Sequence, residues 1–358
     1  MMDGTEGLGA ATETRAVDQY VGLRTRRLLV LFGGVLVLAV VAVHALLVGS
    51  IELPLSTVIE ALGGSAAPMA ERVVWQVRLP RILGGALAGA GLAYVGTAMQ
   101  SILRNPLGAP YTLGISQAAA FGAALSITVT GIESAGGSVF GPYLTTGTAF
   151  LVALSSTSVI LLLIRFKNAS PETLILTGVA LGAVFNAGIT VIQYLASDTE
   201  VAAIVYWTFG DLGRLTWTTV AVMGVGVVAS AGYFSFHAWQ YTVLDAGDET
   251  AASLGIAVER LRVIGMIVGA FATAIVISFV GIIGFVGLVA PHIARKVVGT
   301  DERVLLPASG LVGAILLVGA DTVARTAFDP LTLPVGVLTA FLGAPLFVYL
   351  VIAGREHW

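Results

Sequence analysis

The sequence contains no cysteine and little charge. Of its 358 residues, 11% are charged and 57% are apolar, and the mean hydropathy is +0.94. Soluble domains carry about 25% charged residues, which cover the surface that faces water. Without cysteine, neither a disulfide framework nor a cysteine-ligated metal site can form. These deficits exclude an ordinary soluble protein and predict an integral membrane protein whose solvent is the lipid bilayer.

Motifs for nucleotide and metal chemistry are absent as well. There is no G-x-x-x-x-G-K-[ST] loop to hold nucleotide phosphates and no H-E-x-x-H pair. The four histidines are scattered without the spacing of metal ligands. We therefore expect no catalytic residue, metal site or cofactor in this chain, and no nucleic-acid partner.

Ten apolar runs are present. A helix needs about 20 apolar residues to cross the hydrocarbon core. The runs cover residues 28–48, 80–102, 113–131, 145–164, 173–196, 216–236, 262–280, 283–298, 304–322 and 334–353. The sequence predicts an all-α membrane domain of ten transmembrane helices over residues 28–354, with a disordered cytoplasmic tail over residues 1–27.

The connections between the runs differ in length and charge. Segments 49–79 and 197–215 are long enough for surface helices on the outer side, and segment 237–261 is the longest polar stretch on the inner side. Basic residues are enriched in cytoplasmic segments of membrane proteins. With the N-terminus inside, 13 of the 18 lysines and arginines are internal. The predicted protein is thus a multi-pass protein of the cell membrane with both termini cytoplasmic.

Small residues and rare charges mark the spans. Three spans each carry a pair of glycines four residues apart, on one face of that helix: Gly85 and Gly89, Gly178 and Gly182, and Gly265 and Gly269. This spacing favours close helix packing, and it also suits a smooth wall along a transport path. Asp321 and Arg325 are four residues apart, so they either pair across a helical turn or leave Arg325 free for an external surface.

Three stretches are more specific than a generic membrane helix. They are Val77-Arg78-Leu79-Pro80-Arg81, the segment from Gln100 to Leu113-Gly114 with its Arg104-Asn105-Pro106-Leu107-Gly108, and the segment from Gly284 to Arg295. Together they resemble the FecCD family of ABC-importer permeases over residues 28–353. The cobalamin permeases of that family look most similar over residues 74–81. Thr332 and Gly108 depart from the usual Glu and Ala of the family.

The resemblance implies a type II ABC importer permease fold and a set of partners. Members form homodimers with the path along the two-fold axis. Two ATP-binding cassette subunits dock inside and bind ATP and Mg²⁺, and a solute-binding protein docks outside. The chain would therefore be a transport subunit and not an enzyme.

The resemblance also implies roles for individual residues. Arg78, Arg81 and Arg325 would dock the binding protein, because a guanidinium binds carboxylates in a bidentate manner. The alternative is that Arg78 and Arg81 anchor a helix at the lipid headgroups.

The internal segment 237–261 resembles the loop that couples the permease to its ATPase. A short helix is expected there, with Asp248 as N-cap and Gly255 past its end. The predicted coupling residues are Asp248, Glu249, Ala252, Leu254 and Gly255.

The predicted path lies along the fifth span. The residues assigned to the path and its inner gate are Ser170, Pro171, Gly178, Gly182 and Asn186. Cobalamin permeases have a hydroxyl residue where Pro171 falls.

Cobalamin or a related corrinoid is the first cargo expected, with a ferric siderophore or haem as the alternative. A secondary transporter or channel is a distant alternative, because the spans show no relay of carboxylates.

Overall fold

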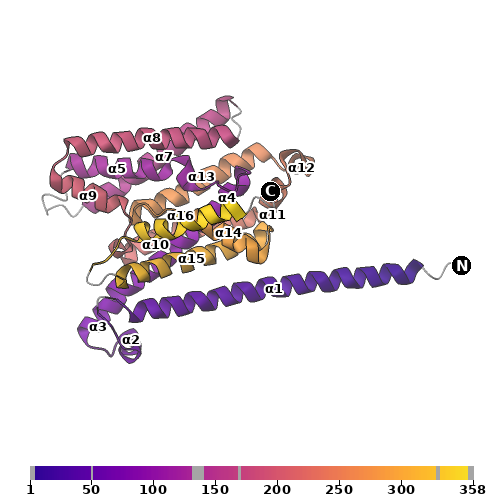
Figure 1. Cartoon of the computed structure of the whole chain (residues 1–358), viewed down its shortest axis with the longest axis horizontal. Coiled ribbons are helices and arrows are strands. Elements are labelled where there is room, and N and C mark those ends of the chain that lie inside the picture. The colour runs from indigo at the N-terminus through magenta and orange to yellow at the C-terminus, as the bar shows by residue number, and fades with distance from the viewer. Residues whose placement is uncertain (1–4, 50, 131–140, 168–170, 328–330, 354–358) are drawn as a thin grey trace.

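The computed structural model describes residues 5–49, 51–130, 141–167, 171–327 and 331–353 (Figure 1). Every regular element in these ranges is helical. The elements are α1 Thr5–Leu47, α2 Leu55–Leu62, α3 Pro68–Arg72, the π-helical η1 Val73–Arg78, α4 Leu79–Ile102, η2 Pro110–Leu113, α5 Ile115–Thr130, α7 Gly141–Lys167, α8 Pro171–Leu195, α9 Asp198–Thr208, η3 Leu212–Arg214, α10 Trp217–Phe236, α11 Ala238–Asp245, α12 Asp248–Ser253, α13 Val258–Val280, α14 Val286–Val298, α15 Glu302–Thr326 and α16 Val335–Ala353.

Each predicted apolar run corresponds to one helix. In chain order these are α1, α4, α5, α7, α8, α10, α13, α14, α15 and α16. Seven segments within the described residues are long and apolar enough to cross a membrane, while α5 and α16 carry shorter apolar stretches. Helix α14 has only 13 residues. The all-α membrane fold is thus confirmed, and the break between the seventh and eighth runs falls at residues 281–285.

The short surface helices lie at opposite ends of the bundle. Figure 1 shows α2, α3 and α9 at one end and α11 and α12 at the other. The first group occupies segments 49–79 and 197–215, and the second occupies segment 237–261. We refer to these as the α9 end and the α12 end. The two sets of loops that the sequence placed on opposite sides of the membrane are therefore separated in space.

Helix α1 includes residues 5–27, where the sequence predicted a disordered tail. Helix α1 runs without a break from Thr5 to Leu47 and extends past the bundle (Figure 1). No proline interrupts this stretch, and alanine, glutamate, leucine and arginine favour helix. Nucleating a new helix is costly, whereas adding residues to an existing helix is not. The helix of the apolar span therefore extends towards the N-terminus into residues 5–27.

Helix α4 forms the centre of the bundle, and glycine lets its neighbours approach it closely. A methyl group at Gly89 would overlap the backbone of Gly313 on α15, and one at Gly96 would overlap the backbone of Gly287 on α14. Because lipid is as apolar as the helix surfaces, such backbone contacts supply much of the attraction between spans. The pairs that the sequence predicted for packing do pack: Gly85 faces Leu212 and Val318, Gly178 faces η2, and Gly265 and Gly269 face α4.

The contact between α4 and α15 predicts a difference between two glycines of one helix. Gly313→Ala places its methyl group against the Gly89 carbonyl, whereas a Cβ at Gly319 has no atom within 4 Å. Overpacking a tight contact costs about 1–3 kcal/mol. We expect Gly313→Ala to lower the melting temperature in detergent, followed by tryptophan fluorescence, and Gly319→Ala to leave it unchanged. Equal melting temperatures for both variants would contradict this packing.

Candidate functional site

The three arginines predicted to dock a binding protein form a cluster at the α9 end. Arg81 on α4 holds both carboxylate oxygens of Asp321 on α15, with N···O distances of 2.8–3.1 Å. Arg325 donates to the same carboxylate at 3.2 Å, so the predicted pairing across one helical turn is confirmed. Asp321 itself is 3% exposed. One buried carboxylate thus joins two guanidinium groups.

The remaining donors of the cluster hold the end of α1. Arg78 donates to the backbone carbonyls of Leu46 and Ile51, and Arg325 donates to those of Val48 at 3.3 Å and Ala45 at 3.4 Å. Free carbonyls at a helix C-terminus need such partners, and cations are favourable there. The guanidinium groups therefore face into the protein. Docking of a binding protein by these residues stays a prediction, and the structure adds a structural role that the sequence did not reveal.

The predicted coupling segment folds as two short helices at the α12 end. Helix α12 begins at Asp248 with Gly247 as its N-cap, so the assignment of Asp248 as N-cap is wrong. The reason is that the Asp248 carboxylate is held by Arg262 at 2.8 Å instead of turning back to the helix N–H groups.

The end of α12 agrees with the prediction. Gly255 has a φ of +81° and donates to the carbonyl of Ala252, while Ile256 donates to that of Ala251. This is the Schellman pattern, which needs glycine at the left-handed position. Of the predicted coupling residues, Glu249, Ala252, Leu254 and Gly255 are exposed, and the Leu254 side chain is 57% exposed.

A second polar cluster at the α12 end was missed by sequence reasoning. Ser101 Oγ lies 3.0 Å from Glu302 Oε1 and 3.3 Å from Asp245 Oδ2. Nearby, Arg295 donates to the Gln100 side chain at 2.9 Å. Glu302 is fully buried, and its Oε2 has no hydrogen-bond partner among the described residues. Because Ser101 has one hydroxyl hydrogen, both contacts are hydrogen bonds at once only when one carboxyl group is protonated.

Burial also affects ionisable groups on α11. It raises the pKa of Tyr241, which is fully buried. Although Asp245 is exposed as a residue, desolvation of its carboxylate raises its pKa above the ordinary value. The only sequence signal for this cluster was the adjacent pair Asp301 and Glu302, which reads as an acidic first helical turn.

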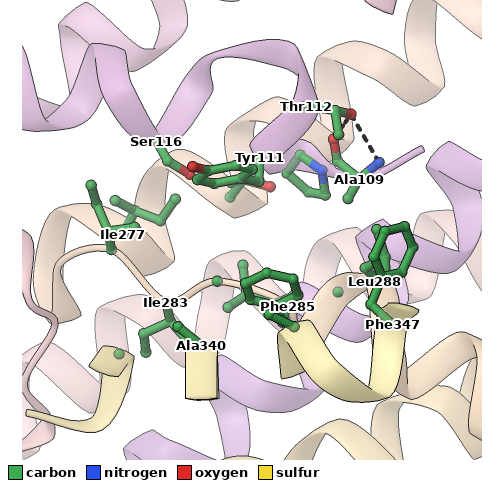
Figure 2. A pocket seen from close by; sticks show the side chains of 18 of the residues that line it. Ala109, Tyr111, Thr112, Ser116, Ile277, Ile283, Phe285, Leu288, Ala340 and Phe347 are labelled. Atoms are coloured by element: carbon green, nitrogen blue, oxygen red, sulfur yellow. Dashed lines mark hydrogen bonds between the residues drawn. The ribbon is translucent and has the colours of Figure 1, made fainter. Parts of the chain in front are cut away.

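A cavity with a volume of about 890 Å³ lies among the described residues. Figure 2 shows Tyr111 and Ser116 on one side of it, with Ile283, Phe285 and Ala340 facing them. None of its described lining residues carries a charge, and the aromatic members are Tyr111, Phe209, Phe285, Phe341 and Phe347. Phe285 has a φ of 66°, which is uncommon for a residue with a side chain. The cavity can accommodate a bulky ligand while offering it few polar partners.

The residues predicted to line the path lie elsewhere. None of them is among the described lining residues of this cavity. Gly178 is buried against η2 with no space for a methyl group, Gly182 is buried beside Gln117, and Asn186 is exposed. Pro171 is the first residue of α8, and Ser170 lies outside the described residues. Their role in a path stays a prediction.

The arginine cluster predicts a large difference between two aspartates. Asp321→Asn removes the charge that Arg81 and Arg325 share, and breaking a buried pair costs about 3–5 kcal/mol. Asp211 lies 3.7 Å from Arg81, but its side chain is 42% exposed, so Asp211→Asn is expected to cost about 1 kcal/mol or less. Thermal unfolding in detergent measures both. A stable Asp321→Asn variant would show that the cluster does not hold the α9 end together.

Comparison with known proteins identifies the family of this chain. The model of the FecCD transport family matches residues 36–353. A putative ABC transporter permease of Methanocaldococcus jannaschii is 47% identical and covers 90% of this chain and 94% of its own length. The cobalamin import permease BtuC of Halobacterium salinarum is 40% identical, covering 78% of this chain and 73% of its own.

A solved structure agrees with these relatives. The inward-facing conformation of a putative metal-chelate type ABC transporter superposes with a TM-score of 0.80 at 32% identity, covering 90% of this chain and 98% of that one. Further relatives at 34–37% identity are named as permeases for hemin, Fe(3+)-citrate and molybdate. The chain belongs to the FecCD transport family and is an ABC importer permease.

Proposed function

We propose that this permease imports cobalamin or a related corrinoid by alternating access, as a homodimer with two ATP-binding subunits and a solute-binding protein. The α12 end would face the cytoplasm together with both termini, and the α9 end would face outward. The observation that carries the proposal is α12, a short helix at one end of the bundle on which Glu249 and Ala252 are exposed, with Leu254 exposed directly after it.

The exposed residues of α12 suit a protein partner. Leu254 is 57% exposed at the end of a helix outside the membrane spans, and Glu249 and Ala252 are exposed beside it. An apolar side chain in such a polar setting is stabilised when a partner covers it. Since the sequence carries no nucleotide-binding loop, an ATP-binding subunit is the partner that an importer of this family needs.

A second copy of the chain fits the apolar face of α8 and α16. Exposed side chains on these helices are Leu176, Val179, Val184, Val191, Phe341, Leu342 and Val348. Helix α8 is the least covered of the long described spans after α1, with 17% of its apolar window buried. In the proposed dimer these helices would lie near the two-fold axis, so that Asn186 and the exposed alanines of α8 would face the path.

The cavity supports a large cargo with an extended apolar surface. Its volume of about 890 Å³ and its aromatic lining suit a planar macrocycle better than a small oxyanion, which needs charged or convergent donors. Identity to a cobalamin permease favours a corrinoid. A ferric siderophore or haem is the alternative cargo, because relatives named for hemin and Fe(3+)-citrate match at 35% and 37%.

If α12 binds the ATP-binding subunit, a charge introduced at Leu254 should weaken that binding. Leu254→Asp puts a carboxylate into a contact that would be dry, and an unpaired buried charge is costly. We expect the recovery of ATP-binding subunit with the tagged permease, purified from native membranes in mild detergent, to fall at least about tenfold. Leu62→Asp is the control, because Leu62 is 44% exposed on α2 at the other end. Equal recovery from both variants would place the ATPase elsewhere.

The transport function itself is tested by reconstitution. Liposomes that contain the permease alone are expected to take up no labelled cobalamin, and uptake should require ATP, the ATP-binding subunit and the binding protein together. Competition with haem and a ferric siderophore identifies the cargo. Robust uptake by the permease alone would overturn the proposal and favour a channel or secondary transporter.

A further inference from the structure

Arg262 joins three helices at the α12 end with a single guanidinium group. It lies in the first turns of α13, and its side chain is 19% exposed. Its Nη1 and Nη2 each donate to one carboxylate oxygen of Asp248 on α12, both at 2.8 Å. Its Nε donates to the carbonyl oxygen of Ile102 at 3.1 Å. All three nitrogen atoms of the guanidinium group thus donate hydrogen bonds within the chain.

The partners of Arg262 are suited to a fixed geometry. Two parallel hydrogen bonds to one carboxylate define its orientation as well as its distance. Ile102 is the last residue of α4, and carbonyls at a helix C-terminus lack partners within the helix. Arg104 supports the pair from the other side, with 3.6 Å between its Nη1 and Asp248 Oδ1. Asp248 therefore lies between two arginines that belong to different parts of the bundle.

Helix α12 has little else to hold it. It is six residues long, too short to be stable by itself, and Ala251 is its one buried residue. Glycines stand at both of its ends, Gly247 with a φ of 121° and Gly255 with a φ of +81°. Such positions bend easily, so the orientation of α12 depends on contacts outside the helix. The Asp248–Arg262 pair is the strongest of these contacts among the described residues.

We propose that Arg262 is a positioning residue that fixes α12 against the ends of α4 and α13, so that a displacement of α12 moves these two spans. Arg262 acts through Asp248 and touches neither nucleotide nor cargo. The proposal rests on the proposed function only for the origin of that displacement, an ATP-binding subunit seated on α12. Helix α4 carries Arg81 of the arginine cluster near its other end, so it links α12 to the α9 end.

The first test needs no partner. The permease alone in nanodiscs is compared by amide hydrogen exchange over residues 248–256, where Ala251, Leu254 and Ile256 donate backbone hydrogen bonds. Arg262→Ala is expected to speed exchange there about tenfold. Arg260→Ala is the matched control, because Arg260 is exposed on the same helix and has no ion pair among the described residues. Unchanged exchange in Arg262→Ala overturns the proposal.

The second test measures coupling in the complex. With the ATP-binding subunit bound, Arg262→Ala is expected to reduce the cargo transported per ATP hydrolysed at least fivefold while leaving recovery of the subunit unchanged. Arg262→Lys keeps the positive charge but cannot bind the carboxylate in a bidentate manner. Its ratio of cargo transported to ATP hydrolysed should lie between those of the wild type and Arg262→Ala. The double variant with Asp248→Ala should be no worse than either single variant, because both remove the same contact.

The outcomes separate the two proposals. Normal transport per ATP in Arg262→Ala, or additive losses in the double variant, overturns the positioning role. Failure of any ATP-binding subunit to bind the wild-type permease overturns the proposed function instead, and hydrogen exchange then decides the role of Arg262 by itself. A melting temperature of Arg262→Lys equal to that of the wild type ensures that a loss of coupling is not a loss of fold.

Discussion

The fold depends on how closely backbones can approach α4. In lipid, no gain from removing apolar surface from water drives one apolar helix onto another, so contact area and short backbone distances must suffice. Gly89 meets Gly313 on α15, and Gly96 meets Gly287 on α14, with no space for a methyl group at either contact. These contacts bring the ends of α4 and α15 together, and among the described residues a polar cluster joins the two helices at each of those ends.

Ion pairs are grouped at both ends of the bundle. At the α9 end, Asp321 lies between Arg81 and Arg325, and at the α12 end, Asp248 lies between Arg104 and Arg262. The interior between them is apolar, and the described cavity has no charged lining residue. An intramembrane charge is costly unless it is paired, which explains why these two aspartates lie at the ends of helices, each between two arginines. Because these charges lie at the ends, the interior of the bundle suits a cargo with an apolar surface.

Hydropathy and local turn chemistry were enough to predict the spans and the end of α12. Run lengths reveal membrane helices directly, and Gly255 after a short polar helix indicates a C-cap by its residue type alone. Pairing between distant residues was not accessible in this way. Arg81 and Asp321 are 240 positions apart, and the local sequence around either residue does not indicate that the two form a pair. For the same reason the contacts of Arg78 with the end of α1 were not predicted, and Glu302, although buried, reads in sequence as an ordinary acidic residue of a first helical turn.

Helix α1 contributes little packing of its own, with 6% of its apolar window buried, yet it is attached near both ends of its span to α15. Arg27 pairs with Asp301 at 3.2 Å, and Arg325 reaches the carbonyls of Ala45 and Val48. Arg78 reaches Leu46 and Ile51 from η1, whereas the residues of α15 and its N-cap that hold α1 are synthesised some 270 to 280 positions after it. During biosynthesis the contacts of the first span with α15 can form only after the ninth span has been inserted, so its attachment is completed late in assembly.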